Sequence, residues 1–271
     1  MNELVQALNS ADARNVLLIL LLSMPRLFMM ISFSPMFGPN VSAVIRIPLA
    51  VAFLLPVAPC VINQALRFGT VDFEIFLLFG LIIKECILGY LLGFCSGFFF
   101  YAAASAGIIV DNQRGATQAM GSDLLIEDQN SPFGAVLMLS LVTLFYSTGV
   151  VASFIILVLE SYVNWPVDAI APGLFGKDLT VFLASGVNMI MCVAVVLCAP
   201  FMMVALMTDI SLGLINRFAP QLNVFILSMP IKSGLCATLI LFFIQPYMEI
   251  GTTYLGRMMN YLNALVKTVS Q

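Results

Sequence analysis

Long apolar runs constrain this chain more than any other feature of its sequence. They occupy most of its length, at about residues 15–37, 47–66, 73–110, 133–159, 179–207 and 222–250. Hydrophobic residues make up 61% of the chain and charged residues only 9%, whereas soluble globular proteins carry about 25% charged residues. The sequence therefore predicts an all-α, membrane-type protein built from long apolar helices and helical hairpins.

The connections between the apolar runs are short and polar. The longest spans only residues 111–132 and has no strand alternation; it ends at Ser131 and Pro132, an N-cap followed by proline at the first helical position. No separate soluble domain fits between the helices, so we expect a single helical domain over residues 1–271. The N-terminal flank carries two acids and one arginine where a signal peptide needs basic residues, so the first helix is expected to be retained.

Two of the runs fit a lipid bilayer badly. Residues 73–110 as one helix would be roughly 57 Å long, against a hydrocarbon core of about 30 Å. The second run contains Pro48, Pro56 and Pro59, which are expected to break or kink a helix. We therefore expect kinked helices in apolar surroundings rather than an ordinary lipid-exposed bundle.

The residue inventory excludes several classes of function. Histidine is absent, which rules out Ser-His and Cys-His nucleophile pairs, His-based zinc sites and histidine proton relays. The six cysteines lie in or beside apolar runs and form no CxxC motif, so we expect small buried hydrophobes rather than metal ligands or disulfides. The net charge of −3 and the pI near 4.8 provide no basic patch for nucleic acid. We predict no enzyme activity, no cofactor and no metal site.

Several charged residues lie within or beside the apolar runs. A charge at mid-bilayer costs about 2.5–3.5 kcal/mol on insertion scales, so each should face protein or water. Lys84 and Glu85 are adjacent and point about 100° apart on a helix, so each is expected to need a partner from another helix or subunit. Two interpretations stay open: buried pairs that fix helix packing, which we favour, or an ion path. The set comprises Arg26, Lys84, Glu85, Asp209 and Lys232.

A compact polar cluster follows the uncharged stretch Cys86–Val110. It consists of Asp111, Asn112, Gln113 and Arg114. On a helix, Asp111 and Arg114 lie at i and i+3, close enough to pair. The cluster is either a helix end that leaves the apolar region for water or a polar contact inside protein, and we predict the contact.

A second polar group begins at Asp209. Asp209, Gly213 and Arg217 are spaced at i, i+4 and i+8, which places them on one helical face. Pro220 is expected to limit this helix, and Lys232 follows in the next apolar run.

A glycine repeat lies inside the third apolar run. Gly89, Gly93 and Gly97 recur at a spacing of four residues in "GYLLGFCSG". Such a stripe lets the backbone of another helix approach closely, so it is a candidate for tight helix packing.

Four segments resemble the SctT/FliR family, also called SpaR/YscT, of type III secretion export-apparatus proteins. The two signature segments are "GIIVDNQRGAT" and "DISLGLINRFAPQLNVFILSMPIKSG", and "MPRLFMMISFSPMF" and "KECILGYLLGF" support them. The resemblance covers essentially the whole chain in the same order. "DNQRGAT" is more similar to the injectisome branch than to the flagellar branch.

The resemblance implies a helical, non-enzymatic subunit of the bacterial inner membrane, multi-pass by its hydropathy. It implies one copy in a spiral complex with several SctR/FliP-type and SctS/FliQ-type subunits, and contact with an SctU/FlhB-type subunit and with membrane lipid. That complex forms the portal for unfolded substrate proteins in transit, and partner subunits would enclose much of these helices. The polar cluster at residues 111–114 would then meet partner helices or the chain's own second polar group.

An ion-coupled secondary transporter is the alternative function. Such a transporter would use the charges within the apolar runs as a coupling relay, and it predicts an internal repeat with interrupted helices in both halves. The sequence offers only "SMP" at 23–25 and again at 228–230, a match short enough to arise by chance.

Overall fold

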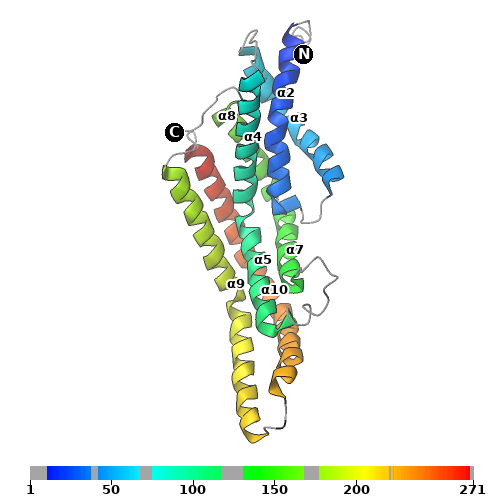
Figure 1. The fold of residues 1–271 in the computed structure, drawn as a ribbon, viewed down its shortest axis with the longest axis vertical. Coiled ribbons are helices and arrows are strands. Elements are labelled where there is room, and N and C mark those ends of the chain that lie inside the picture. The colour runs from blue at the N-terminus through cyan, green and yellow to red at the C-terminus, as the bar shows by residue number, and fades with distance from the viewer. Residues whose placement is uncertain are drawn as a thin grey trace. The chain divides into compact units, whose positions relative to one another are not determined.

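Every element in the part of the chain that the structure describes is a helix. The computed structural model describes residues 11–37, 42–67, 75–116, 131–167, 177–219, 221 and 223–268. The predicted all-α class is confirmed within these residues (Figure 1). The elements are α2 (Ala11–Phe33), the short 3-10 helix η1 (Pro35–Phe37), α3 (Ala43–Arg67), α4 (Ile75–Ser96), α5 (Phe98–Arg114), α7 (Pro132–Ser147), α8 (Val150–Asn164), α9 (Lys177–Phe218) and α10 (Val224–Thr268).

The helices are grouped in two compact units. Unit 1 contains α2, η1, α3, α4 and α8, together with α9 up to Gly186 and α10 from Gly256 onward. Unit 2 contains α5 and α7 and the remaining parts of α9 and α10. The single export domain expected over residues 1–271 stays a prediction.

Among the described residues, four helices are long and apolar enough to cross a membrane, namely α3, α4, α9 and α10. Helices α7 and α8 could together make a fifth span. At 42 and 45 residues, α9 and α10 rise about 63 and 68 Å along their axes. Both are roughly twice as long as the hydrocarbon core of a bilayer, about 30 Å.

The apolar run at residues 73–110, too long for one span as a single helix of roughly 57 Å, forms two helices in the described part from residue 75 onward. Helix α4 ends at Ser96 and α5 begins at Phe98. Between them, the N–H of Gly97 donates to the Phe94 carbonyl at 3.0 Å, a three-residue turn in place of a helical bond. Glycine is about 1 kcal/mol less favourable than alanine inside a helix, which makes this position a low-cost place to end one.

Of the two effects expected from the prolines of the second apolar run, a break does not occur in α3. Pro48, Pro56 and Pro59 lie inside the continuous helix Ala43–Arg67. In apolar surroundings the backbone has no water to bond, so leaving the helix costs more than the hydrogen bond that each proline removes. Other helices also contain internal prolines, namely Pro25, Pro200, Pro230 and Pro246.

The core of unit 2 is aromatic and connects all of its helices. Phe100 of α5 meets Phe145 of α7 edge to face, with ring centroids 6.0 Å apart. Phe133 of α7 meets Phe201 of α9 at 4.8 Å, and Phe201 meets Phe243 of α10 at 5.8 Å. Edge-to-face pairs contribute about 0.5–1.5 kcal/mol each beyond the area they bury, so this chain of rings fixes how the four helices pack.

Candidate functional site

Two glycines of α4 let that helix cross α2 at backbone contact distance. A Cβ atom on Gly89 would lie 2.2 Å from the carbonyl oxygen of Arg26, and one on Gly93 would lie 2.6 Å from that of Met30. Neither position accepts a side chain unless a backbone moves. The tight packing partner of these glycines is therefore a helix of the same chain, whereas Gly97 lies in the turn after α4.

One turn before Gly89, the same crossing brings three charged side chains together. Arg26, Lys84 and Glu85 form what we call the buried triad. The Nε and Nη2 atoms of Arg26 donate to the two carboxylate oxygens of Glu85 at 2.7 and 2.9 Å. The Nζ atom of Lys84 lies 2.9 Å from Oε1 of Glu85, and the three side chains are 0%, 5% and 0% exposed in sequence order. Glu85 thus has the partner from another helix that its burial requires, and Lys84 also reaches it because its stem is long and flexible.

The triad holds the C-terminal end of α8. Arg26 donates to the carbonyls of Ser161 and Trp165 at 3.1 and 2.9 Å, and Lys84 donates to two carbonyls just beyond the helix at 3.0 and 2.9 Å. In the triad, two cations share one carboxylate. The carbonyl end of a helix carries a partial charge of about −0.5, so α8 presents a charge of opposite sign to the two cations.

Arg26 is the central residue of this cluster, a role that the sequence analysis did not assign. Its guanidinium carbon lies 4.2 Å from the centre of the Tyr162 ring, in cation–π geometry. The Tyr162 hydroxyl donates to the carbonyl of Ser23 at 2.9 Å, which ties α8 to α2 a second time. In the sequence, an arginine inside an apolar run was the sign that Arg26 has such a role. Nothing in the sequence marked Tyr162 or Trp165 in the same way.

In unit 2, Asp111 binds the N-terminus of α7. The side chain is 1% exposed, and its Oδ2 atom accepts from the Ser131 hydroxyl and, at 3.1 Å, from the N–H of Phe133. The other oxygen lies 2.6 Å from Nη2 of Arg114, so the pair expected from the i, i+3 spacing forms. A carboxylate is favourable here because the first N–H groups of a helix are unpaired and carry positive partial charge.

The position of Asp111 follows from a glycine contact between α5 and α7. A Cβ atom on Gly107 would lie 2.1 Å from the Cα atom of Gly134, so the two helices touch at these residues. Asp111 is one turn further along α5 and therefore meets the start of α7. The predicted start of α7 is confirmed, since Ser131 is the N-cap and accepts from the N–H of Gly134, and Pro132 is the first helical residue.

Lys232 connects the second polar group to the first. Its Nζ atom lies 2.6 Å from Oδ1 of Asp209 and donates to the carbonyl of Gln113 at 3.2 Å. Gln113 is in the last turn of α5, whose final carbonyls lack intrahelical partners, so Lys232 caps that helix. Of the two contacts expected for residues 111–114, the one with the chain's own second polar group is present. We call Asp111, Arg114, Ser131, Asp209 and Lys232 the polar network.

The remaining predicted residues take smaller parts in these clusters. Asn112 is exposed, and Gln113 contributes only its main-chain carbonyl to the network. Arg217 is exposed near the end of α9, and nothing lies within 4 Å of the position where a Cβ of Gly213 would be. Of the three residues expected on this helical face, Asp209, Gly213 and Arg217, only Asp209 belongs to the polar network. Helix α9 ends at Phe218, before Pro220, which lies outside the described residues.

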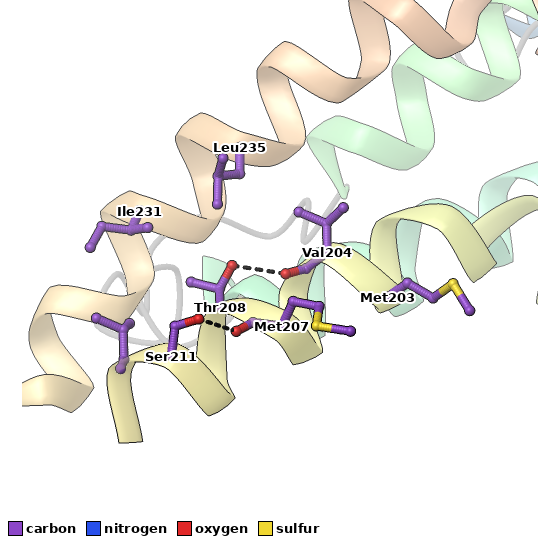
Figure 2. Close-up of a pocket in the computed structure, with 8 residues that line it drawn as sticks. Met203, Val204, Met207, Thr208, Ser211, Ile231 and Leu235 are labelled. Carbon is purple, nitrogen blue, oxygen red and sulfur yellow. Dashed lines mark hydrogen bonds between the residues drawn. The ribbon is translucent and has the colours of Figure 1, made fainter. Parts of the chain in front are cut away.

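An apolar groove runs between α9 and α10 beside the polar network (Figure 2). Its volume is about 410 Å³. The hydroxyls of Thr208 and Ser211 donate to carbonyls of their own helix, each at 2.8 Å, so the groove presents hydrocarbon rather than free polar groups. The lining residues are Met203, Val204, Met207, Thr208, Ser211, Leu212, Ile231 and Leu235.

Comparison with known sequences decides the family. The model of bacterial export proteins, family 1, matches residues 17–258, which include both polar clusters and the groove. The chain belongs to this family. Among curated relatives, it is 36% identical to Yop proteins translocation protein T of Yersinia pestis over 80% of this chain and 81% of that protein. It is 30% identical to the secretion system apparatus protein SsaT of Salmonella typhimurium over 71% of this chain and 73% of SsaT. It is 28% identical to the flagellar biosynthetic protein FliR of Bacillus subtilis over 73% of this chain and 75% of FliR.

These relatives confirm the predicted family, and its injectisome-like character agrees with the higher identities to the translocation and secretion proteins. This member of the export family is thus a component of a type III secretion export apparatus at the bacterial inner membrane. It works with other export subunits, and the alternative of an ion-coupled transporter is not supported.

Proposed function

We propose that the chain helps to form the inner-membrane portal through which unfolded substrate proteins enter the export path. In this proposal its partners are SctR/FliP-type and SctS/FliQ-type subunits and an SctU/FlhB-type subunit, with membrane lipid covering the rest. Its contribution is structural: it shapes the portal and carries out no reaction of its own.

The observation that carries this proposal is the length of exposed apolar surface on α9. Exposed hydrophobic side chains occur along the helix from Val181 through Val195, Met203 and Leu214 to Phe218. Val181 and Phe218 are about 56 Å apart along the helix. A bilayer about 30 Å thick covers only about 40 Å of a helix even at a tilt of 40°. Protein with apolar surface of its own is needed to cover the remainder.

The groove between α9 and α10 is a suitable place for one partner helix. Its walls are aliphatic and methionine side chains, and methionine adapts its shape to a packing partner. Asp209 and Lys232, which follow the groove-lining residues Thr208 and Ile231 in the chain, form an ion pair whose carboxylate is 43% exposed. Apolar surface surrounded by polar groups is typical of a protein contact.

The first experiment compares the chain purified alone with the chain co-expressed with SctR-type and SctS-type subunits. We expect a stable complex that elutes as one species only when the partners are present, because the exposed apolar faces then become buried. A chain that is monodisperse by itself and does not copurify with these partners would contradict the proposal.

A pair of variants tests the groove itself. Ile231→Gln places an amide in the apolar groove and should lower the yield of the complex while the chain alone still inserts into membranes. Thr253→Gln, on an exposed and already polar part of the same helix, is the matched control and should leave the yield unchanged. Equal yields for the two variants would remove the groove from the proposed interface.

A further inference from the structure

A tyrosine of α10 contacts the backbone of α9 at one carbonyl. The ring of Tyr261 stacks on that of Phe182 with centroids 3.9 Å apart, and its hydroxyl donates to the Phe182 carbonyl. The same carbonyl accepts from the Ser185 hydroxyl at 2.7 Å, and the two hydroxyl oxygens are 3.2 Å apart. These three residues all belong to unit 1.

This arrangement weakens one specific bond of α9. In an α-helix the Phe182 carbonyl accepts from the N–H of Gly186, four residues later. The hydroxyls of Tyr261 and Ser185 both donate to this carbonyl and therefore compete with the N–H of Gly186 for it. Side chains that enter the hydrogen-bond ladder in this way are a known cause of helix bending.

Gly186, the residue that supplies the N–H of this bond, is also of the type that resists helix bending least. Glycine has no Cβ and gives up about 1 kcal/mol of helix stability relative to alanine. Gly186 is, in addition, the residue at which α9 leaves unit 1. The chain's other passages between the two units occur at Gly97, Gly149 and Gly256. Two observations of different kinds, a competing hydroxyl and a glycine at the unit boundary, therefore coincide at Gly186.

We propose that Tyr261 and Gly186 form a hinge at which α9 bends. The tyrosine hydroxyl already donates to the Phe182 carbonyl, so this carbonyl keeps a hydrogen-bond donor when α9 bends and the N–H of Gly186 moves away. The use of this hinge during export rests on the function proposed above, whereas the bending itself is a property of this chain alone.

The competing interpretation is that Tyr261 is a brace that fixes α10 against α9. The two interpretations predict opposite effects of Tyr261→Phe, which removes the hydroxyl and keeps the ring stack. If the tyrosine is a brace, its loss loosens the contact and α9 samples more conformations. If it supports a hinge, its loss returns the Phe182 carbonyl to Gly186, and α9 becomes stiffer.

Distances between spin labels along α9 measure the bending directly. Labels at the exposed positions Val181 and Val195 flank the hinge and are about 21 Å apart along a straight helix. Labels at Met203 and Phe218, also exposed, are about 22 Å apart and flank Gly213, a helical glycine with nothing within 4 Å of the position of a Cβ. Both pairs are placed in the full-length chain with its native cysteines replaced, in lipid nanodiscs, alone and with its export partners.

We expect a broader distance distribution for the pair across the hinge than for the control pair. Tyr261→Phe and Gly186→Ala should each narrow it to the width of the control, whereas Gly213→Ala should change neither distribution. A broader distribution in Tyr261→Phe, or equal widths for both pairs in the unmodified chain, would overturn the hinge. Because the isolated chain is measured as well, this result is independent of whether the proposed partners bind.

Discussion

Replacing Glu85 by glutamine removes the carboxylate of the buried triad and leaves its two cations. Arg26 and Lys84, whose side chains are 0% and 5% exposed, would then lose the carboxylate that they share. Removing one partner of a buried ion pair costs about 3–5 kcal/mol, a large share of the roughly 5–15 kcal/mol by which proteins are stable. Glutamine keeps the volume of glutamate, so the loss reports charge rather than packing.

Lys84→Met provides the comparison, because it changes the charge balance in the opposite direction. It leaves Arg26 and Glu85 as a neutral pair with two parallel hydrogen bonds, the strongest geometry for such a pair. The remaining cost is two carbonyls that lose a donor, about 1–3 kcal/mol. Lys84→Glu should cost more than Lys84→Met because it places a second buried carboxylate beside Glu85.

Thermal unfolding of the purified protein in detergent, followed by size-exclusion chromatography of heated samples, ranks these variants. At about 2–4 °C per kcal/mol, the midpoint should fall by about 6–20 °C for Glu85→Gln and by about 2–12 °C for Lys84→Met. Glu249→Gln makes the same chemical change at an exposed site of α10 and should cost less than about 0.5 kcal/mol. Charge balance does not govern this cluster if Lys84→Met lowers the unfolding midpoint as much as Glu85→Gln does. The same conclusion follows if Glu85→Gln lowers the midpoint no more than Glu249→Gln does.

Two further substitutions test the helix crossing and the polar network. Gly93→Ala should lower the yield of folded protein, and Gly93→Leu should abolish it, because even a Cβ would lie 2.6 Å from the Met30 carbonyl oxygen. Gly80→Ala is the control and should leave the yield unchanged, because nothing lies within 4 Å of its Cβ position. Arg114→Ala removes the ion partner of Asp111 but leaves the contacts of that carboxylate with α7, so we expect a loss of about 1–3 kcal/mol and reduced secretion through poor assembly. Arg114→Lys should rescue secretion only in part because the planar guanidinium is lost, and near-normal secretion and complex yield in Arg114→Ala would show that the cluster is merely a polar helix end.

The helices and their caps could be predicted from the sequence because their signals are local. Apolar composition over tens of residues predicts a membrane-type helix wherever it lies, and Ser131 followed by proline is sufficient to mark the start of α7. The i, i+3 pair of Asp111 and Arg114 is equally local. The family also followed from the sequence, because its segments are continuous in the chain.

Which individual side chains of distant segments meet could not be predicted from residue patterns, since this depends on how two helices are aligned. Arg26 and Glu85 are 59 residues apart, and only the crossing at Gly89 places them together. The glycine repeat shows the same limit. Gly89, Gly93 and Gly97 have equal spacing, yet the first two cross α2 from within α4 and the third lies in the turn that ends the helix.

Both polar clusters lie at helix ends, which explains why so apolar a chain keeps these charges. The buried triad meets the carbonyl end of α8, Asp111 meets the N–H end of α7, and Lys232 meets the carbonyl end of α5. A helix end buried away from water leaves backbone groups unpaired, and a buried charge lacks its hydration; each cost falls when the two are placed together. Every cation and carboxylate in these clusters faces either an opposite charge or a helix end of complementary sign. This pattern favours the interpretation that the charges fix helix packing, because an ion path would need groups left free to exchange partners.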